Sequence, residues 1–296
     1  MTSARDRYWV GFEPASDALR AVALQRGAVV AATEIRLATT DGSLSIEDLE
    51  RLAHAMQRQG VPPSAAWVAC PPERHVVAAV LELPPRESGA PIEALAGSEL
   101  ARDRRTGDVA IAAIDLPRAP RAKGPAAEYL AVGGGHDAIL DLVKRCESVG
   151  IRIEAVDTPV TALARLAGQG VRLIAEVLNQ TYRLHVCVHG RPAFSHVVSV
   201  RPGIACAVQL PEEVDRCAAY LAARGGDIDI ESIILAGPGA RDSRTIEAIR
   251  NEFNTAVDRW EGGRWAAPDS RIADPAFAQA AALSLWPQTD TGRVAA

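Results

Sequence analysis

The sequence predicts an α/β protein built from two similar halves. Each half opens with three strand-like segments joined by tight turns and continues with a helix and a further strand. Residues 8–37 align with residues 171–200 without a gap, at the offset that separates positions 13 and 176. Three residue types recur at that offset: Glu13 and Glu176, Arg20 and Arg183, and Gly27 and Gly190. Because strands fall on strands and turns on turns, the alignment indicates an internal duplication.

The first half is expected to hold four strands and one helix. The helix begins at Ser45, whose hydroxyl can cap it, and Gly60 ends it. Its apolar residues form one stripe at helical spacing, which predicts a helix packed on a sheet. The strands are bounded by turns rich in Pro, Ser and Gly, and they are expected at residues 8–12, 19–24, 29–37 and 65–70.

The middle of the chain and the second half also alternate strands and helices. Further strands are expected at residues 75–83, 109–116, 129–132, 171–177, 182–188, 193–200 and 232–236. Further helices are expected at residues 91–102, 137–149, 212–224, 243–253 and 275–285. The loop 117–125 is basic and Pro-rich, so we expect it to be exposed and mobile. Residues 287–296 are expected to form a disordered tail.

Composition argues against several classes of function. The net charge of −5 argues against nucleic acid as a partner, because phosphate binding needs a basic surface. The five cysteines show no CxxC spacing and fit reduced thiols. No apolar run approaches the ~18 residues of a membrane span, and residues 1–7 are polar. We therefore expect a cytoplasmic protein without direct membrane insertion.

Five segments, in order along the chain, resemble motifs of one protein family. They are residues 10–20, 80–85, 146–165, 190–195 and 233–240, with the sequences VGFEPASDALR, VLELPP, CESVGIRIEAVDTPVTALAR, GRPAFS and IILAGPGA. Together they resemble PilM, the actin-like protein of type IV pilus assembly, whose relatives include FtsA and the cytoplasmic part of GspL. The resemblance covers nearly the whole chain and implies the duplicated actin/Hsp70/ribonuclease H-like fold.

Within that fold, the resemblance implies a division into subdomains. The first half, subdomain 1A, would comprise residues 1–75 with 158–170 and 272–286. Residues 76–157 would form an inserted small α/β lobe, subdomain 1C, and residues 171–271 the second half, subdomain 2A. The link between the 190–195 motif and the next expected helix is short, so subdomain 2B would be nearly absent.

The resemblance also places a nucleotide site between the first turns of the two halves. In this fold, backbone amides of the two turns hold phosphates and their acids organise magnesium. The residues at the matching positions are Glu13, Ser16, Arg20, Glu176, Asn179, Gly237 and Gly239. Ala15 and Leu178 stand where glycines are expected, and a Cβ there hinders the approach of phosphate. We therefore expect no cofactor, or weak binding of ATP and magnesium, and we assign no catalytic residue.

Two other motifs have a functional and a structural interpretation. His185, Cys187 and His189 alternate along one expected strand and His196 lies on the next, a set that could ligate zinc. An ordinary hairpin is the favoured alternative, because this spacing is uncommon among zinc sites. The three glycines at 133–135 could cradle an anion, but they match no phosphate-binding motif and are favoured as a tight turn.

The function implied by the resemblance is assembly, with enzymatic activity doubtful. A PilM-like scaffold of a type IV pilus or type II secretion-like machine would bind the cytoplasmic peptide of a PilN-like inner-membrane protein, in a groove between subdomains 1A and 1C. That partner would hold the protein at the inner membrane, and self-association is left open. The alternative is an active ATP-binding ATPase or small-molecule kinase of the actin/sugar-kinase fold, which intact Gly-rich phosphate turns would favour.

Overall fold

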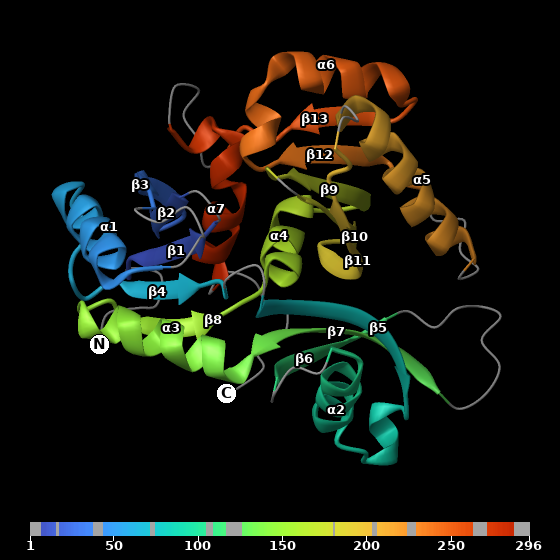
Figure 1. Ribbon diagram of the computed structural model, residues 1–296, viewed down its shortest axis with the longest axis horizontal. Helices are drawn as coiled ribbons and strands as arrows, with labels where there is room; N and C mark the ends of the chain where they lie inside the picture. Colours follow the sequence, from blue (N-terminus) through green and yellow to red (C-terminus); the bar gives the residue numbers. More distant parts are fainter. Residues whose placement is uncertain are drawn as a thin grey trace.

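The computed structural model describes residues 7–15, 18–37, 44–71, 75–104, 109–116, 126–179, 181–202, 206–223, 229–262 and 271–286. The described elements form two five-stranded sheets and one three-stranded sheet, arranged as in Figure 1. The expected loop 117–125 and the expected tail 287–296 lie outside these ranges.

The first sheet has the strand order β3-β2-β1-β4-β8. Its strands are β1 (Trp9–Pro14), β2 (Ala18–Gln25), β3 (Ala28–Arg36), β4 (Ala66–Ala69) and β8 (Ile153–Val156). Helix α1 (Ile46–Arg58) connects β3 to β4 and buries its apolar stripe on the sheet. A capping box fixes its start, because the Ser45 hydroxyl accepts from the Asp48 N–H at 3.0 Å and the Asp48 carboxylate accepts in return.

The second sheet repeats this order as β11-β10-β9-β12-β13. Its strands are β9 (Val171–Val177), β10 (Thr181–Val188), β11 (Arg191–Ser199), β12 (Ser232–Ala236) and β13 (Ala256–Arg259). Helices α5 (Cys206–Ala223) and α6 (Ser243–Glu252) pack on it around a separate apolar core. The predicted α/β fold with two similar halves is confirmed.

The duplication extends to irregularities of the backbone. The register shifts after Ala23 in β2 and after Val186 in β10, which are equivalent positions. The turns that follow contain Arg26 at φ 53° and His189 at φ 49°, again equivalent, and each is followed by a glycine at positive φ. Two successive residues at positive φ are typical of the tight turns that suit twisted hairpins.

The third sheet forms a small lobe with the antiparallel order β5-β7-β6. Its strands are β5 (Val76–Leu83), β6 (Val109–Asp115) and β7 (Ala127–Gly135), and α2 (Ile92–Arg104) covers one face. Helix α3 (His136–Ser148) leaves the lobe and packs against α1 and β8. Thus α3 and β8, which fall within the expected insert 76–157, lie with the first sheet.

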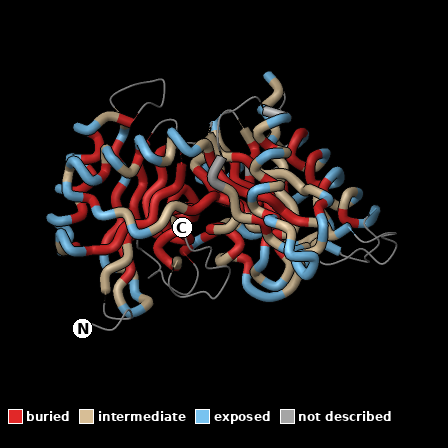
Figure 2. Tube along the Cα trace, turned by 90° about the horizontal axis from the view of Figure 1, so that it is seen from below, coloured by how far each residue is buried: buried red, intermediate tan, exposed pale blue. Residues whose placement is uncertain are grey.

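Two interior helices join the larger sheets. Helix α7 (Ala278–Ser284) packs on β1 and β2, and α4 (Pro159–Ala167) packs on β9, β10 and α7. The close approach of α7 requires Gly11, because a Cβ there would lie 2.2 Å from the Ala280 carbonyl oxygen. Buried residues follow the central strands of both sheets and these helices (Figure 2). Within the described ranges, no helix is both long and apolar enough to cross a membrane.

Three features differ from the sequence-based expectation. Helix α5 begins at Cys206 and runs through Pro211, whereas the sequence placed its start at Glu212, because the residue before a proline is biased away from helix. The strands β8 and β13 were not expected, since each has only four residues, which include one polar residue in β8 and two in β13. Helix α4 was not expected as a helix and begins at Pro159, the favoured first position for proline.

Candidate functional site

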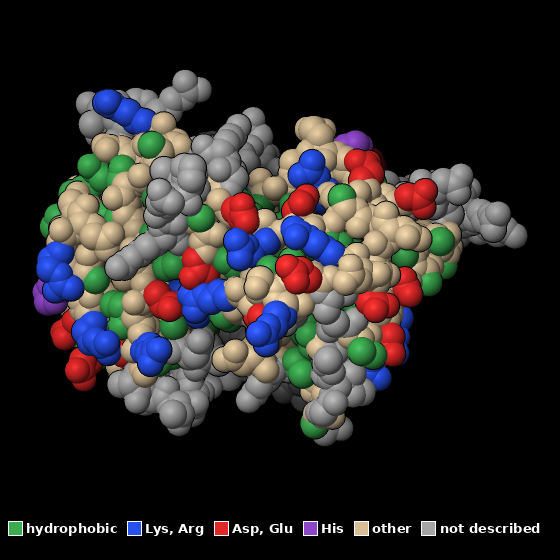
Figure 3. Space-filling model, turned by 90° about the horizontal axis from the view of Figure 1, so that it is seen from above, with side chains coloured by type: hydrophobic (Ala, Val, Ile, Leu, Met, Phe, Trp, Pro, Cys, Tyr) green, Lys and Arg blue, Asp and Glu red, His purple; other side chains and the backbone are tan. Residues whose placement is uncertain are grey.

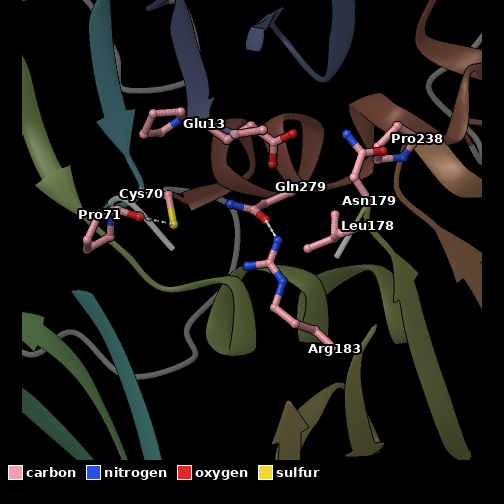
Figure 4. Close-up of a pocket in the computed structure, with 10 residues that line it drawn as sticks. Glu13, Cys70, Pro71, Leu178, Asn179, Arg183, Pro238 and Gln279 are labelled. Atoms are coloured by element: carbon pink, nitrogen blue, oxygen red, sulfur yellow. Dashed lines mark hydrogen bonds between the residues drawn. The ribbon is translucent and has the colours of Figure 1, made fainter. Parts of the chain in front are cut away.

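The first turns of the two halves meet at a small pocket. One turn joins β1 to β2 after Glu13, and the other joins β9 to β10 after Glu176. Figure 4 shows side chains from both turns and from α7 converging there. The pocket has a volume of ≈ 20 Å³, which is room for about one water molecule. Its lining includes Glu13, Cys70, Leu178, Asn179, Arg183 and Gln279.

Glu13 is buried beside an arginine of the neighbouring strand. It lies opposite Arg20 in the β1–β2 ladder, with Oε1 of Glu13 3.5 Å from Nη1 of Arg20. Arg20 is also buried, and its Nε donates to Glu34 at 2.6 Å. Burial raises the pKa of Glu13 to about 7, although Arg20 opposes the shift. Close to neutral pH, this carboxyl group is therefore protonated in about half of the molecules.

Glu176 occupies the equivalent position but is held more firmly in its ionised form. Arg183 lies opposite in the β9–β10 ladder, with its Nε 3.0 Å from Oε2 of Glu176. His185 places Nε2 3.5 Å from the same oxygen. Burial alone would raise the pKa of Glu176, but Arg183 and His185 outweigh it and the pKa lies below its usual value. Burial lowers the pKa of His185, so this imidazole is mostly neutral at pH 7.

The amides that begin the two turns close the turns themselves. The Ala15 N–H donates to the Ala18 carbonyl at 2.9 Å, and the Leu178 N–H donates to the Thr181 carbonyl at 3.0 Å. These two bonds are equivalent under the duplication. The Leu178 side chain extends toward the pocket (Figure 4).

Gly237 and Gly239, two of the expected nucleotide-site residues, pack closely against the end of β9. A Cβ on Gly237 would lie 2.7 Å from the Val177 carbonyl oxygen, and one on Gly239 would lie 2.4 Å from Val177 Cγ1. Gly237 also has φ 84° and donates its N–H to the Pro275 carbonyl at 2.9 Å. Contacts between the loop and β9 therefore require both glycines without any ligand.

The structure brings most of the expected site residues together. Glu13 and Asn179 line the pocket, and Arg20 and Glu176 are ion-pair partners in the two ladders beside it. Ser16 lies outside the described residues.

Two pocket residues escaped the sequence interpretation. Gln279 accepts from Nη2 of Arg183 at 3.2 Å, and nothing in the alanine-rich sequence of α7 marks it. Cys70 donates to the Pro71 carbonyl at 3.3 Å, and burial raises its pKa well above the usual value. It is therefore a poor nucleophile. His185, which contacts Glu176, could have been found from its spacing to Arg183, since alternate strand residues share a face.

The zinc alternative is not supported by the hairpin geometry. His185 contacts Glu176 and Ser195, whereas His189 occupies the turn and His196 lies 3.4 Å from Glu213. Among the residues that the structure describes, no three His, Cys, Asp or Glu side chains are grouped as metal ligands. The glycines at 133–135 end β7 and lead directly into α3, as expected for a tight strand-to-helix connection.

Ion pairs join the two halves beside the pocket. Arg241, in the 3₁₀ helix η4 (Pro238–Arg241), lies 2.9 Å from Glu34 of β3 and 2.7 Å from Asp274. Glu34 continues the network to Arg20. Acidic and basic side chains alternate across the middle of the face seen in Figure 3. This network and the Arg183–Gln279 bond hold the halves in the conformation that has the small pocket.

A further buried ion pair lies in the segment 146–165. Asp157 and Arg165 form a direct contact, with 6% and 2% of their side chains exposed. The Asp157 carboxylate also accepts from the Thr158 N–H at 2.8 Å and from the Thr161 hydroxyl. Arg165 Nη1 donates to the Ala282 carbonyl at 3.2 Å, and its guanidinium lies over the Trp286 ring. This arginine therefore ties α4 to α7.

Two five-stranded sheets of equal strand order, joined through two interior helices, define the actin-like ATPase fold. The chain is structurally similar to PilM: a chain of the PilM-PilN type IV pilus biogenesis complex matches with a TM-score of 0.70 and 14% identity, over 94% of this chain and 97% of that one. The cytoplasmic domain of EpsL, from the type II secretion system of Vibrio cholerae, matches with a TM-score of 0.53 and 12% identity, over 95% and 96%.

The same fold occurs in proteins with other roles. The ethanolamine utilization protein EutJ from Carboxydothermus hydrogenoformans matches with a TM-score of 0.55 and 11% identity, over 94% of this chain and 89% of that one. No protein-family model matches the chain, and no curated protein matches it by sequence. At these identities, the similarity establishes the fold and leaves the function to the site.

Proposed function

We propose that this chain is an assembly scaffold of the PilM kind, in which internal ion pairs replace the nucleotide. The observation that carries the proposal is the pocket between the first turns. Its acids are paired with Arg20 and Arg183, and its volume of ≈ 20 Å³ suits about one water molecule. The structural similarity to PilM in its complex with PilN supports the assembly role.

The proposed partner is the cytoplasmic peptide of a PilN-like inner-membrane protein in a type IV pilus or type II secretion-like machine. The scaffold would lie in the cytoplasm and reach the membrane through this partner. We propose the subdomain boundaries given above, except that α3 and β8 belong with the first sheet, which leaves β5, α2, β6 and β7 as subdomain 1C. Subdomain 2B would be nearly absent, since β11 ends at Ser199 and α5 begins at Cys206.

The three-stranded lobe offers a face for such a peptide. One face packs on α2, and the other carries apolar side chains toward α4, where Val160 joins Leu130 and Val132. Val80 and Ile114 extend this second face and are half-buried. Strands β5 and β6 are both edges of the sheet. An extended peptide could therefore use backbone hydrogen bonds at an edge and apolar pockets on the face.

Charging this face is expected to weaken partner binding. Val80→Asp and Ile114→Asp should each weaken binding of the cytoplasmic PilN-like peptide about tenfold or more, because a buried apolar contact would be replaced by a desolvated charge. Isothermal titration with the synthetic peptide would measure the loss. Leu140→Asp on α3, an exposed apolar residue outside this face, is the matched control. Unchanged affinity in both variants would contradict the assigned surface.

Mg-ATP is expected to leave the melting temperature unchanged at millimolar concentration. A ligand at ~100 times its Kd would stabilise the protein by ~2.7 kcal/mol, which would raise the melting temperature by several degrees. The pocket between the turns has a volume of ≈ 20 Å³ and includes Leu178 in its lining, so it lacks the space that such binding needs. A shift of several degrees that Glu13→Ala or Glu176→Ala abolishes would favour the alternative, an ATPase or small-molecule kinase.

A further inference from the structure

A groove on the outer edge of the first half is separate from the pocket and from the lobe. It lies between β3 and α1 and has a volume of ≈ 550 Å³, which is in the range of ligand sites. Its lining comes from these two elements alone and includes Thr33, Glu34, Arg51, His54, Arg58 and Gln59.

The strand side of the groove is a sheet edge, and side chains of Gln59 and Arg51 already bond some of its backbone groups. β3 is the outermost strand of the first sheet. The Ala32 N–H donates to Oε1 of Gln59 at 3.3 Å, and Nη1 of Arg51 donates to the Arg36 carbonyl at 3.5 Å. Alternate residues of an antiparallel strand direct their N–H and C=O groups to the same side. Glu34 lies midway between these two hydrogen bonds, so its backbone N–H and C=O groups face the groove.

The helix side of the groove is basic. Arg51, His54 and Arg58 follow each other at spacings of three and four residues, which puts them on one stripe of α1. All three are exposed. The acid in the lining, Glu34, is neutralised from behind, with Arg20 at 2.6 Å and Arg241 at 2.9 Å. Arg51 is also paired with Asp48 at 3.2 Å, whereas Arg58 forms no ion pair with the described residues, so the positive charge available in the groove is that of Arg58.

We propose that this groove binds an extended acidic segment of a partner protein. The segment would pair with the backbone of Glu34 and place a carboxylate on Arg58, a combination of strand addition and a charge-assisted hydrogen bond. A peptide fits better than a nucleic acid, because a strand edge supplies backbone hydrogen bonds that a phosphodiester chain cannot match.

The test uses the full chain and a fluorescent short peptide that alternates Glu and Val. We expect saturable binding by fluorescence anisotropy, weakened by added salt and weakened about tenfold or more by Arg58→Glu. Arg244→Glu, an exposed arginine on α6, is the matched control and should bind like the wild type. Because both arginines are exposed, both variants should melt at the wild-type temperature.

A second readout locates the bound peptide. Hydrogen exchange of the Glu34 amide should slow at saturating peptide, whereas free glutamate should leave it unchanged. A second peptide, which alternates Lys and Val, serves as the control. The proposal is overturned if this basic peptide binds as well as the acidic one, or if Arg58→Glu binds the acidic peptide like the wild type. Tighter binding of a single-stranded oligonucleotide than of the acidic peptide would likewise overturn it.

Discussion

Replacing Arg165 by methionine is expected to destabilise the protein by about 3–5 kcal/mol, because removing one partner leaves the other charge buried. Asp157 has 6% of its side chain exposed and lies against Arg165 between the first sheet and α4. The same substitution removes the bond to the Ala282 carbonyl and the contact with Trp286, both of which hold the interior helices together. Urea unfolding at neutral pH would measure the loss.

The control for this prediction is a surface pair of the same chemistry. Arg102 pairs with Glu99 on α2 at 3.0 Å, with both side chains exposed, so Arg102→Met should cost about 1 kcal/mol or less. The double variant Asp157→Asn with Arg165→Met should recover part of the loss, since it removes the unpaired charge. A cost below about 1 kcal/mol for Arg165→Met alone would contradict the structural role of the buried pair.

The sequence predicts the duplicated strands well because their signals are local. Each hairpin carries its own turn residues, and the recurrence of Glu13 and Arg20 at Glu176 and Arg183 aligns the halves without any structure. Once the register of each hairpin is known, the acid on its first strand lies directly opposite the arginine on its second strand. The repeat therefore already contains both ion pairs of the site.

The remainder of the site depends on contacts that are distant in sequence. Gln279 meets Arg183 through α7, and Arg241 meets Glu34 across the two halves. Neither contact has a periodicity that a single sequence reveals. The small size of the pocket depends on such distant contacts too. Ala15 and Leu178 stand where glycines were expected, so they predict a poor phosphate site, but they do not predict which side chains fill the space. Packing of α7 and of the 237–239 loop decides that.

The two equivalent glutamates differ in how closely an arginine pairs with each of them. Arg20 divides its charge between Glu13 at 3.5 Å and Glu34 at 2.6 Å, whereas Arg183 lies 3.0 Å from Glu176 with His185 nearby. Burial therefore raises the pKa of Glu13 to about 7, while the pKa of Glu176 lies below its usual value despite burial. Glu13 would therefore have to release a proton before it could ligate magnesium.

Glutamine at the two positions is accordingly expected to change stability in opposite directions. A raised pKa means that the folded state keeps a proton that the unfolded state loses, so the stability due to Glu13 is present below about pH 4.5 and is lost as pH rises through about 7. At about pH 8, Glu13→Gln should stabilise the protein by about 3 kcal/mol, and by much less at about pH 5. Glu176→Gln should destabilise it by about 3–5 kcal/mol at both pH values, because the lowered pKa keeps Glu176 ionised throughout this range and the substitution removes the carboxylate beside the buried Arg183. Urea unfolding of the wild type and both variants at the two pH values would measure these differences. Equal changes in the free energy of unfolding for the two substitutions at about pH 8 would contradict this prediction, because they would show that Glu13 and Glu176 are equally stable in their ionised forms.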